Sequence, residues 1–205
     1  LKGFVNGVLR NISRNLDKVS YPDPSDEITC LSVRYSLPMW MVEKWISVYG
    51  KETVEKMGKA FLEERPVTVR RNTAVVSKEE FEKELEKDGV VYRRHPVLPY
   101  AYELTNYDYL AGLLAFQKGY FYIQDISSMQ VAEWAEPKEG DYVIDVCAAP
   151  GGKAIHLAEK LSGTGYVEAR DLTEYKVALI EENIERSGLD NIEAVCQDAM
   201  INDEA

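Results

Sequence analysis

The stretch of sequence that decides the fold is Asp145-Val-Cys-Ala-Ala-Pro-Gly-Gly-Lys153, which joins an apolar segment to an amphipathic one. The apolar segment, residues 142–146, is predicted to be a strand, and residues 153–161 are predicted to be a helix. The side chains between them are small, which lets a bound ligand approach the backbone of the loop. A strand, a loop of this kind and a helix together form the ligand-binding junction of an open α/β sheet.

The chain continues after this junction as alternating strands and helices. Residues 166–169 and 192–196 are predicted strands, and residues 177–184 between them show helical periodicity. This order predicts a parallel, doubly wound sheet. We therefore expect an α/β fold, in which residues 124–205 form the first half of a Rossmann-like sheet.

A small α+β domain is predicted upstream of this sheet, over residues 65–123. Ser77-Lys-Glu-Glu80 is a capping box, which indicates the start of a helix. Apolar segments on both sides of that helix predict the strands of the domain, at residues 66–71, 90–92, 100–104 and 120–123.

The N-terminal residues are predicted to be mostly helical. Residues 1–19 show an amphipathic helical pattern, and residues 20–64 contain a polar, proline-containing linker followed by helices. Ser36 is a candidate N-cap for a helix at residues 38–49, and Gly50 is expected to end that helix. The three tryptophans fall in helical segments and are expected to pack in the core: Trp40, Trp45 and Trp134.

The cysteines and histidines predict neither a disulfide framework nor a metal site. Three scattered cysteines, Cys30, Cys147 and Cys196, indicate a reducing cytoplasm and have no zinc-binding spacing. Cys196 is expected to be a buried strand residue. His95 and His156 lack a partner pattern for a metal or a general base and are interpreted as structural.

Net charge and hydropathy limit the classes of partner. The formal net charge is -11, which counts against a simple nucleic-acid binder, although a local basic patch can act within an acidic chain. No apolar run approaches the ~20 residues of a membrane helix, so no membrane partner is expected. The chain starts at Leu1 and ends at Ala205, just after a predicted strand, and we expect it to be a fragment of a longer protein.

The loop and two later aspartates predict S-adenosylmethionine as the cofactor. The loop has neither the dinucleotide spacing G-x-G-x-x-G nor the phosphate-binding P-loop pattern, and therefore suits a ligand without a pyrophosphate. Asp171, at the end of the second strand, is placed to accept hydrogen bonds from ribose hydroxyls, and Asp198 to meet the adenine amino group. Asp145 ends the first strand. Each aspartate alone is as well explained as a helix cap. The predicted cofactor-binding residues are Cys147, Ala148, Ala149, Pro150, Gly151, Gly152, Lys153, Asp171 and Asp198.

These residues resemble a known family. Residues 145–153 are similar to the first motif of the RNA 5-methylcytosine methyltransferases, the Sun/Fmu (Nol-Nop-Sun) family, and Asp171 and Gln197-Asp198-Ala199 match its second and third motifs. Gln124-Asp125-Ile-Ser-Ser128 resembles the segment that precedes the first motif. Arg70-Arg71-Asn72-Thr73 is similar to a stretch of the family's small RNA-binding domain.

The resemblance implies a substrate and a mechanism. Residues 4–10 resemble the last helix of a NusB-like domain in the family's bacterial 16S rRNA member, which implies small-subunit rRNA as the partner. In this family a cysteine thiolate adds to C6 of a flipped-out cytosine, C5 takes the methyl group, and a second cysteine helps release the product. Both cysteine motifs of the family would lie beyond Ala205, so no catalytic residue is assigned within the chain. Thr29-Cys30 precedes the cofactor domain and is rejected as the nucleophile. The 205-residue polypeptide alone is expected to be inactive.

The resemblance also implies an RNA-facing surface on the small domain. Cations would hold phosphates there and exposed rings would stack on bases. The candidate residues are Arg70, Arg71, Arg93 and Arg94, with Lys118, Tyr92, Tyr120 and Tyr122. The alternative is a solvated charged face with the tyrosines in the core.

Three other functions compete with this interpretation. An FtsJ-like ribose 2'-O-methyltransferase has a similar loop but lacks a long N-terminal extension, and a non-catalytic RNA-binding module would keep only a vestigial cofactor fold. An NAD-dependent dehydrogenase is disfavoured by the loop spacing. In the usual strand order, residues 142–146 would form an open apolar edge, which predicts weak cofactor affinity and self-association.

Overall fold

The computed structural model describes residues 2–201, and the chain divides into two compact units, residues 1–65 and 66–205. Two predicted segments extend outside the described part. The first helix was predicted from Leu1, and the Rossmann-like part was predicted to extend over residues 202–205. The expectation that the family's catalytic cysteines lie beyond Ala205 also concerns sequence outside the described residues, and it stays a prediction. No helix within residues 2–201 has the length and apolar character needed to cross a membrane.

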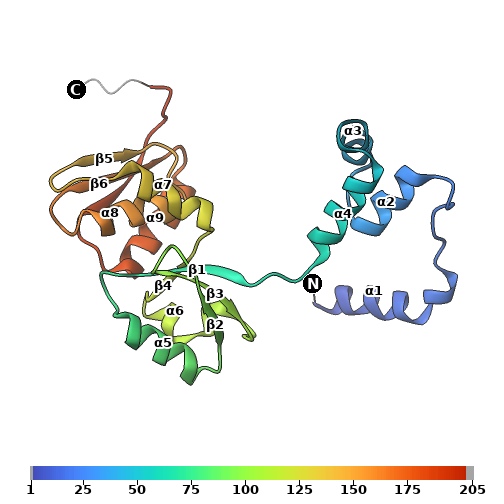
Figure 1. Ribbon diagram of the computed structural model, residues 1–205, viewed down its shortest axis with the longest axis horizontal. Coiled ribbons are helices and arrows are strands. Elements are labelled where there is room, and N and C mark those ends of the chain that lie inside the picture. Colours follow the sequence, from blue (N-terminus) through green and yellow to red (C-terminus); the bar gives the residue numbers. More distant parts are fainter. Residues whose placement is uncertain (1, 202–205) are drawn as a thin grey trace. The chain divides into compact units, whose positions relative to one another are not determined.

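The N-terminal unit is helical. Its elements are α1 (Lys2–Arg14), the 3-10 turn η1 (Leu16–Lys18), α2 (Glu27–Tyr35), α3 (Met39–Tyr49) and α4 (Lys51–Leu62) (Figure 1). Apolar residues of the last three helices form one core: Leu31, Tyr35, Val42 and Val54. Helix α1 has no buried residue, so its apolar stripe remains exposed within the described chain.

Several expectations for helical segments are wrong. Helix α2 was not predicted: it starts at Glu27, the last residue of the expected linker, because the Asp26 side chain accepts a hydrogen bond from the Thr29 N–H at 3.0 Å and caps it. Ser36 is not an N-cap: it ends α2 in a left-handed conformation, with φ of 54°. Two tryptophans are exposed rather than in a core, Trp40 to 62% and Trp134 to 83%, because each lies on the helix face away from the apolar cluster.

The small domain is a four-stranded antiparallel sheet with helices on one face. Its elements are β1 (Val67–Arg71), α5 (Lys78–Lys87), β2 (Val91–Arg94), β3 (Ala101–Thr105), the 3-10 turn η2 (Leu110–Gly112), α6 (Leu114–Gln117) and β4 (Phe121–Ile123). The strand order is β2-β3-β1-β4. The Ser77 side chain caps α5 by accepting from the Glu80 N–H, which confirms that half of the predicted capping box. Phe81, Leu85, Tyr102 and Phe121 are buried between the sheet and its helices.

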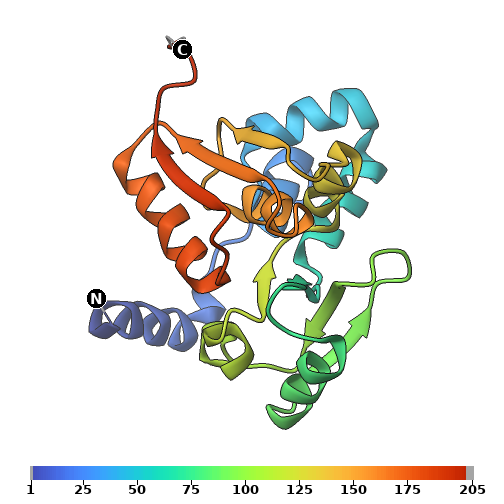
Figure 2. The same cartoon turned by 90° about the vertical axis from the view of Figure 1, so that its left-hand side faces the viewer.

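The second part of this unit contains the predicted Rossmann-like sheet and is called the cofactor domain below. Its elements are α7 (Ile126–Ala135), β5 (Tyr142–Asp145), α8 (Gly152–Lys160), β6 (Tyr166–Asp171), α9 (Glu174–Ser187) and β7 (Ile192–Cys196). The strands are parallel in the order β5-β6-β7. Helices α8 and α9 lie against this sheet, as Figure 2 shows from a second side. Val167 and Ala169 of β6 pack with them in one core. The expected α/β fold is therefore confirmed.

The edges of this sheet expose residues of both outer strands. Among the described residues, β5 pairs with β6 alone, and Tyr142 and Ile144 are 58% and 43% exposed. The predicted apolar edge is present. Cys196, which was expected to be buried, is exposed, because it is the last residue of the outer strand β7.

Candidate functional site

The loop that follows β5 is a tight turn whose form requires glycine. Gly151 has φ of +102°, and a Cβ there would lie 3.4 Å from Cγ2 of Ile180. Inside the turn, the Gly151 N–H donates to the Ala148 carbonyl at 2.6 Å, and the Ala148 N–H donates to the Arg170 carbonyl at 2.8 Å. The loop is thus fixed both to itself and to strand β6.

Asp171, the last residue of β6, ties the loop to the neighbouring strand. Its Oδ2 accepts from the Ala149 N–H at 3.0 Å, and its Oδ1 accepts from the Leu172 N–H and the Lys176 ammonium. Burial alone would raise the pKa of Asp171, but the Ala149 N–H, Lys176 and the Leu172 N–H together hold that pKa below its usual value. A buried, ionised carboxylate at the carboxyl end of a parallel strand is a strong hydrogen-bond acceptor.

The other two aspartates also follow strand ends of the same sheet. Asp145 ends β5 and accepts from the Cys147 N–H at 3.3 Å. Burial raises the pKa of Asp145, and the nearby charge of Asp171 adds to this rise against the opposing effects of Cys147 and Lys153. Asp198 lies two residues after β7, where it accepts from the Met200 N–H at 2.9 Å.

These residues fit an adenosyl ligand by their chemistry. A carboxylate has about four acceptor positions, and Asp171 uses three of them, one for an exposed lysine that a ligand can displace. The loop contributes no bulky side chain, and Cys147 and Lys153 lie at its two ends. Helix α8 begins at Gly152, and the N–H groups of its first turn suit the carboxylate of an amino-acid ligand.

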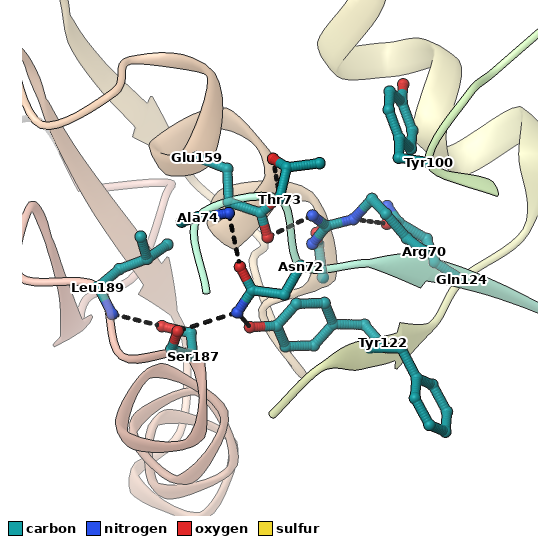
Figure 3. Close-up of polar contacts among 12 residues, drawn as sticks. Arg70, Asn72, Thr73, Ala74, Tyr100, Tyr122, Gln124, Glu159, Ser187 and Leu189 are labelled. Carbon is teal, nitrogen blue, oxygen red and sulfur yellow. Dashed lines mark hydrogen bonds and ion pairs between the residues drawn. The ribbon is translucent and has the colours of Figure 1, made fainter. Parts of the chain in front are cut away.

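A buried ion pair joins the small domain to the cofactor domain. Arg70 in β1 is fully buried and pairs with Glu159 in α8, as Figure 3 shows. The Arg70 Nε–H donates to Gln124 at 2.7 Å, and its Nη2 lies 3.5 Å from the Gly152 carbonyl. Burial raises the pKa of Glu159, and the Arg70 charge opposes that rise.

Asn72, two residues later, makes a second connection (Figure 3). Its Nδ2 donates to the carbonyls of Gly119 and Ser187 and to the Tyr122 hydroxyl, at 3.1, 2.9 and 3.0 Å, and its Oδ1 accepts from the Ala74 N–H. The Ser187 carbonyl belongs to the last turn of α9, where no N–H of the helix is left to donate to it. The end of α9 is therefore capped by the small domain.

The predicted RNA-facing patch does not form as one surface. Arg70 was wrongly assigned to it, because the residue is in the interior against Glu159, and Tyr122 is buried beside it. Arg71 is partly buried and donates to the Val76 carbonyl. Arg93 and Arg94 remain exposed on opposite faces of β2, paired with Glu103 and Glu82 respectively.

The polar connection between the domains was not predicted. Gln124 was noted only as part of a resembling segment, and its hydrogen bonds to Arg70 and Ser128 give it a structural role. His156 is buried with its ring against Tyr100, and burial, together with the charges of Arg70 and Lys160, lowers its pKa to about 2. Since Nδ1 of this imidazole lacks a partner, His156 is a neutral core residue in this structure.

A wide hollow lies away from these residues. It has a volume of about 720 Å³ and lies in the N-terminal unit, lined by Tyr21, Cys30, Arg34 and their neighbours. None of the predicted cofactor residues lines it. We place the candidate site at the ends of β5, β6 and β7 instead, because the glycine-dependent turn and the buried acid are both there. No cluster of metal-binding side chains occurs within residues 2–201.

Two family models match the chain. Residues 132–205 match the family described as 16S rRNA methyltransferase RsmB/F. Residues 37–108 match a ferredoxin-like domain described as RsmF/B-like. A curated relative, the probable ribosomal RNA small subunit methyltransferase B of Bacillus subtilis, is 37% identical over 97% of this chain. The chain spans 44% of the length of that relative.

Two solved structures are similar over most of the chain. One is a crystal structure of PH0851, with 28% identity and a TM-score of 0.78, covering 90% of this chain and 42% of that one. The other is NSun6 from Pyrococcus horikoshii with SFG, with 26% identity and a TM-score of 0.69, covering 77% of this chain and 64% of that one.

Proposed function

Because this chain belongs to the RsmB/F family of 16S rRNA methyltransferases, we propose that it carries the cofactor-binding part of an S-adenosylmethionine-dependent enzyme that methylates C5 of cytosine in small-subunit rRNA. Family membership supports methyl transfer to rRNA. The resemblance of residues 145–153, Asp171 and residues 197–199 to the Sun/Fmu motifs supports C5 of cytosine as the acceptor. The NSun6 neighbour, which was solved with the S-adenosylmethionine analogue SFG, supports the cofactor.

In the proposed complex, this chain binds and orients the cofactor. Asp171 accepts hydrogen bonds from the ribose hydroxyls, Asp198 meets the adenine amino group, and residues 147–153 lie along the methionine portion. When bound, S-adenosylmethionine supplies a methyl group on an electrophilic sulfonium. The observation that carries the proposal is the buried Asp171 carboxylate, which holds the Ala149 N–H of the glycine-dependent turn.

Calorimetry with two cofactors tests the binding step. We expect S-adenosylmethionine to bind this chain and NAD to give no heat, because the loop offers no pyrophosphate cradle. Binding of NAD in preference to S-adenosylmethionine would instead support a dehydrogenase. A chain that bound neither compound would contradict the proposed cofactor role.

Nucleoside analysis of rRNA tests the acceptor. Deleting the gene that encodes this chain should remove a 5-methylcytidine from small-subunit rRNA. Loss of a 2'-O-methylated nucleotide in its place would favour the ribose methyltransferase alternative. Unchanged small-subunit rRNA would contradict the proposed substrate. A cytoplasmic location agrees with this substrate and with the three free cysteines.

The proposal for RNA binding now rests on the exposed part of the small domain. Arg93 and Arg94 keep guanidinium groups at the surface and are the remaining candidates for phosphate contacts. We expect the 205-residue polypeptide, Leu1 to Ala205, to bind RNA weakly and to show no turnover with unmodified small-subunit rRNA. Turnover by this polypeptide would overturn that expectation.

The open edge of β5 supports a further expectation for the isolated polypeptide. Tyr142 and Ile144 are exposed along a strand with free backbone groups, which favours pairing with a second copy. Sedimentation should therefore show association that increases with concentration. Calorimetry should show weak cofactor affinity. A monodisperse monomer that binds the cofactor tightly would contradict it.

A further inference from the structure

A series of hydrogen bonds connects the small domain to the cofactor loop, residues 147–153. Arg186, near the end of α9, donates from Nη1 to the Phe121 carbonyl of β4 at 3.1 Å. Its Nη2 donates to Oδ1 of Asn183 at 2.8 Å. Asn183 in turn donates from Nδ2 to the Pro150 carbonyl of the loop at 2.9 Å. Three hydrogen bonds in series thus connect a strand of one domain to the cofactor loop of the other.

Packing around Pro150 is incomplete on this side of the loop. A hollow of about 180 Å³ borders Pro150, Gly152, Asn183 and Arg186. A carbonyl beside such a hollow is fixed by its hydrogen bonds rather than by van der Waals contact. The Asn183 amide is therefore the principal constraint on the Pro150 carbonyl here.

The arginine of this relay is itself fixed by rings of the small domain. The Arg186 guanidinium lies 4.4 Å from the ring centroid of Phe116 and 5.0 Å from that of Tyr122. Arg70 lies 4.7 Å from the same Tyr122 ring and reaches toward the Gly152 carbonyl at the other side of the turn. The planar guanidinium suits this double role, since it donates to two acceptors while it stacks on rings.

The docking of α9 on the small domain leaves little freedom in this arrangement. Gly119 packs so closely against α9 that a Cβ on it would lie 1.9 Å from the Arg186 carbonyl, and its φ is +67°. Asn72 caps the next carbonyl, that of Ser187, from the same domain. The position of Arg186 is thus set by the small domain, through Asn72, Gly119 and Phe121, and not by α9 alone.

From these contacts we propose that Arg186 and Asn183 are positioning residues for S-adenosylmethionine, through which the small domain holds residues 147–153 in the shape that binds the cofactor. Neither residue contacts the cofactor in this scheme. The inference rests on the proposed function, because it assumes that the loop binds S-adenosylmethionine. It assigns the small domain a role in cofactor binding in addition to any contact with RNA.

Hydrogen-deuterium exchange of the ligand-free chain tests the loop directly. In Arg186→Met, which keeps the length and apolar stem of the side chain, we expect faster exchange of the peptide that covers residues 147–153. Calorimetry on the same variant should give a dissociation constant for S-adenosylmethionine about tenfold higher, which corresponds to about 1.4 kcal/mol. Arg186→Lys should resemble Arg186→Met, since one ammonium cannot reproduce the fork that reaches both acceptors.

A matched control and a double-variant comparison separate positioning from loss of stability. Arg94→Met also removes a hydrogen-bonded arginine, but Arg94 pairs with Glu82 of α5 and does not reach the loop. It should leave both loop exchange and cofactor affinity unchanged. Because Arg186 and Asn183 act in series, Arg186→Met combined with Asn183→Ala should weaken binding no more than Asn183→Ala alone.

The outcomes distinguish a failure of this inference from a failure of the proposed function on which it rests. Loop exchange that stays at the wild-type rate in Arg186→Met would overturn the inference even if S-adenosylmethionine binds normally. Faster exchange with an unchanged dissociation constant would overturn it as well, as would fully additive effects in the double variant. Absence of binding to the wild-type chain would overturn the proposed function, and the assigned cofactor role would fail with it.

Discussion

Strands β1 and β2 of the small domain end in the same dipeptide, yet the two arginine pairs have opposite surroundings. Arg70 and Arg93 extend from the same face of the sheet, since Arg93 pairs across the strands with Glu103 and Glu103 with Thr68. Arg70 is in a central strand that the cofactor domain covers, whereas Arg93 is in the edge strand β2. The difference shows that docking between domains, rather than local sequence, decides which arginine remains at the surface.

The largest expected effect comes from breaking the buried pair. Arg70→Met leaves the Glu159 carboxylate, only 3% exposed, without its counter-charge, and should lower the free energy of unfolding by about 3–5 kcal/mol. Denaturant unfolding measures this loss. Adding Glu159→Leu should recover much of the lost stability, because an apolar pair needs no charge compensation. A loss in Arg70→Met below about 1 kcal/mol would show that the pair is not buried as described.

A smaller effect concerns His156, which is buried beside this pair. Its pKa is about 2 in the folded chain against 6.5 for the free group, so the unfolded chain binds more protons between these values. Stability should therefore fall as the pH falls below 6.5, by up to about 1.4 kcal/mol per pH unit from this residue. His156→Phe keeps a ring against Tyr100 and should make unfolding less sensitive to pH between about 6.5 and 5. An unchanged pH dependence would contradict a neutral, buried imidazole.

The edge strand gives the matched comparison for stability. Arg94→Met breaks an ion pair whose arginine is half-exposed, so solvent already screens most of the interaction. We expect a much smaller loss of stability than in Arg70→Met, measured in the same denaturant series. Equal losses in the two variants would remove the distinction between the central strand and the edge strand.

The smallest effect on folding is expected at Arg93. Arg93→Ala should leave the unfolding curve unchanged, because this side chain is 77% exposed. It should weaken binding to a small-subunit rRNA segment a few-fold and reduce the salt dependence of binding by about one ion. Affinities measured at several salt concentrations give both quantities. RNA affinity equal to that of the wild type would exclude Arg93 from the interface.

Helices and strands in all parts of the chain could be predicted from sequence where their signals are local. Alternation of apolar segments predicted the three parallel strands, and Ser77 identified the start of α5. Asp26 carried an equally local signal for α2, which was overlooked in favour of the prolines before it. The glycines and small residues of the loop likewise indicated a close turn.

The contacts between the domains could not be predicted in the same way. Arg70 and Glu159 are far apart in sequence, and nothing near either residue indicates its partner. The same is true of Asn183 and Arg186, whose acceptors belong to the cofactor loop and to β4. Basic residues on a predicted strand therefore suggested an RNA surface, although topology had placed one of them in the interior.

The central claim is that the turn at residues 147–153 and the carboxylate of Asp171 hold an adenosyl cofactor. A crystal structure of the chain with S-adenosylhomocysteine would test this most directly. We predict ribose hydroxyls within hydrogen-bonding distance of Asp171 and the amino-acid portion of the ligand along residues 147–153. A ligand bound elsewhere, with Asp171 still occupied only by its present protein donors, would contradict the account.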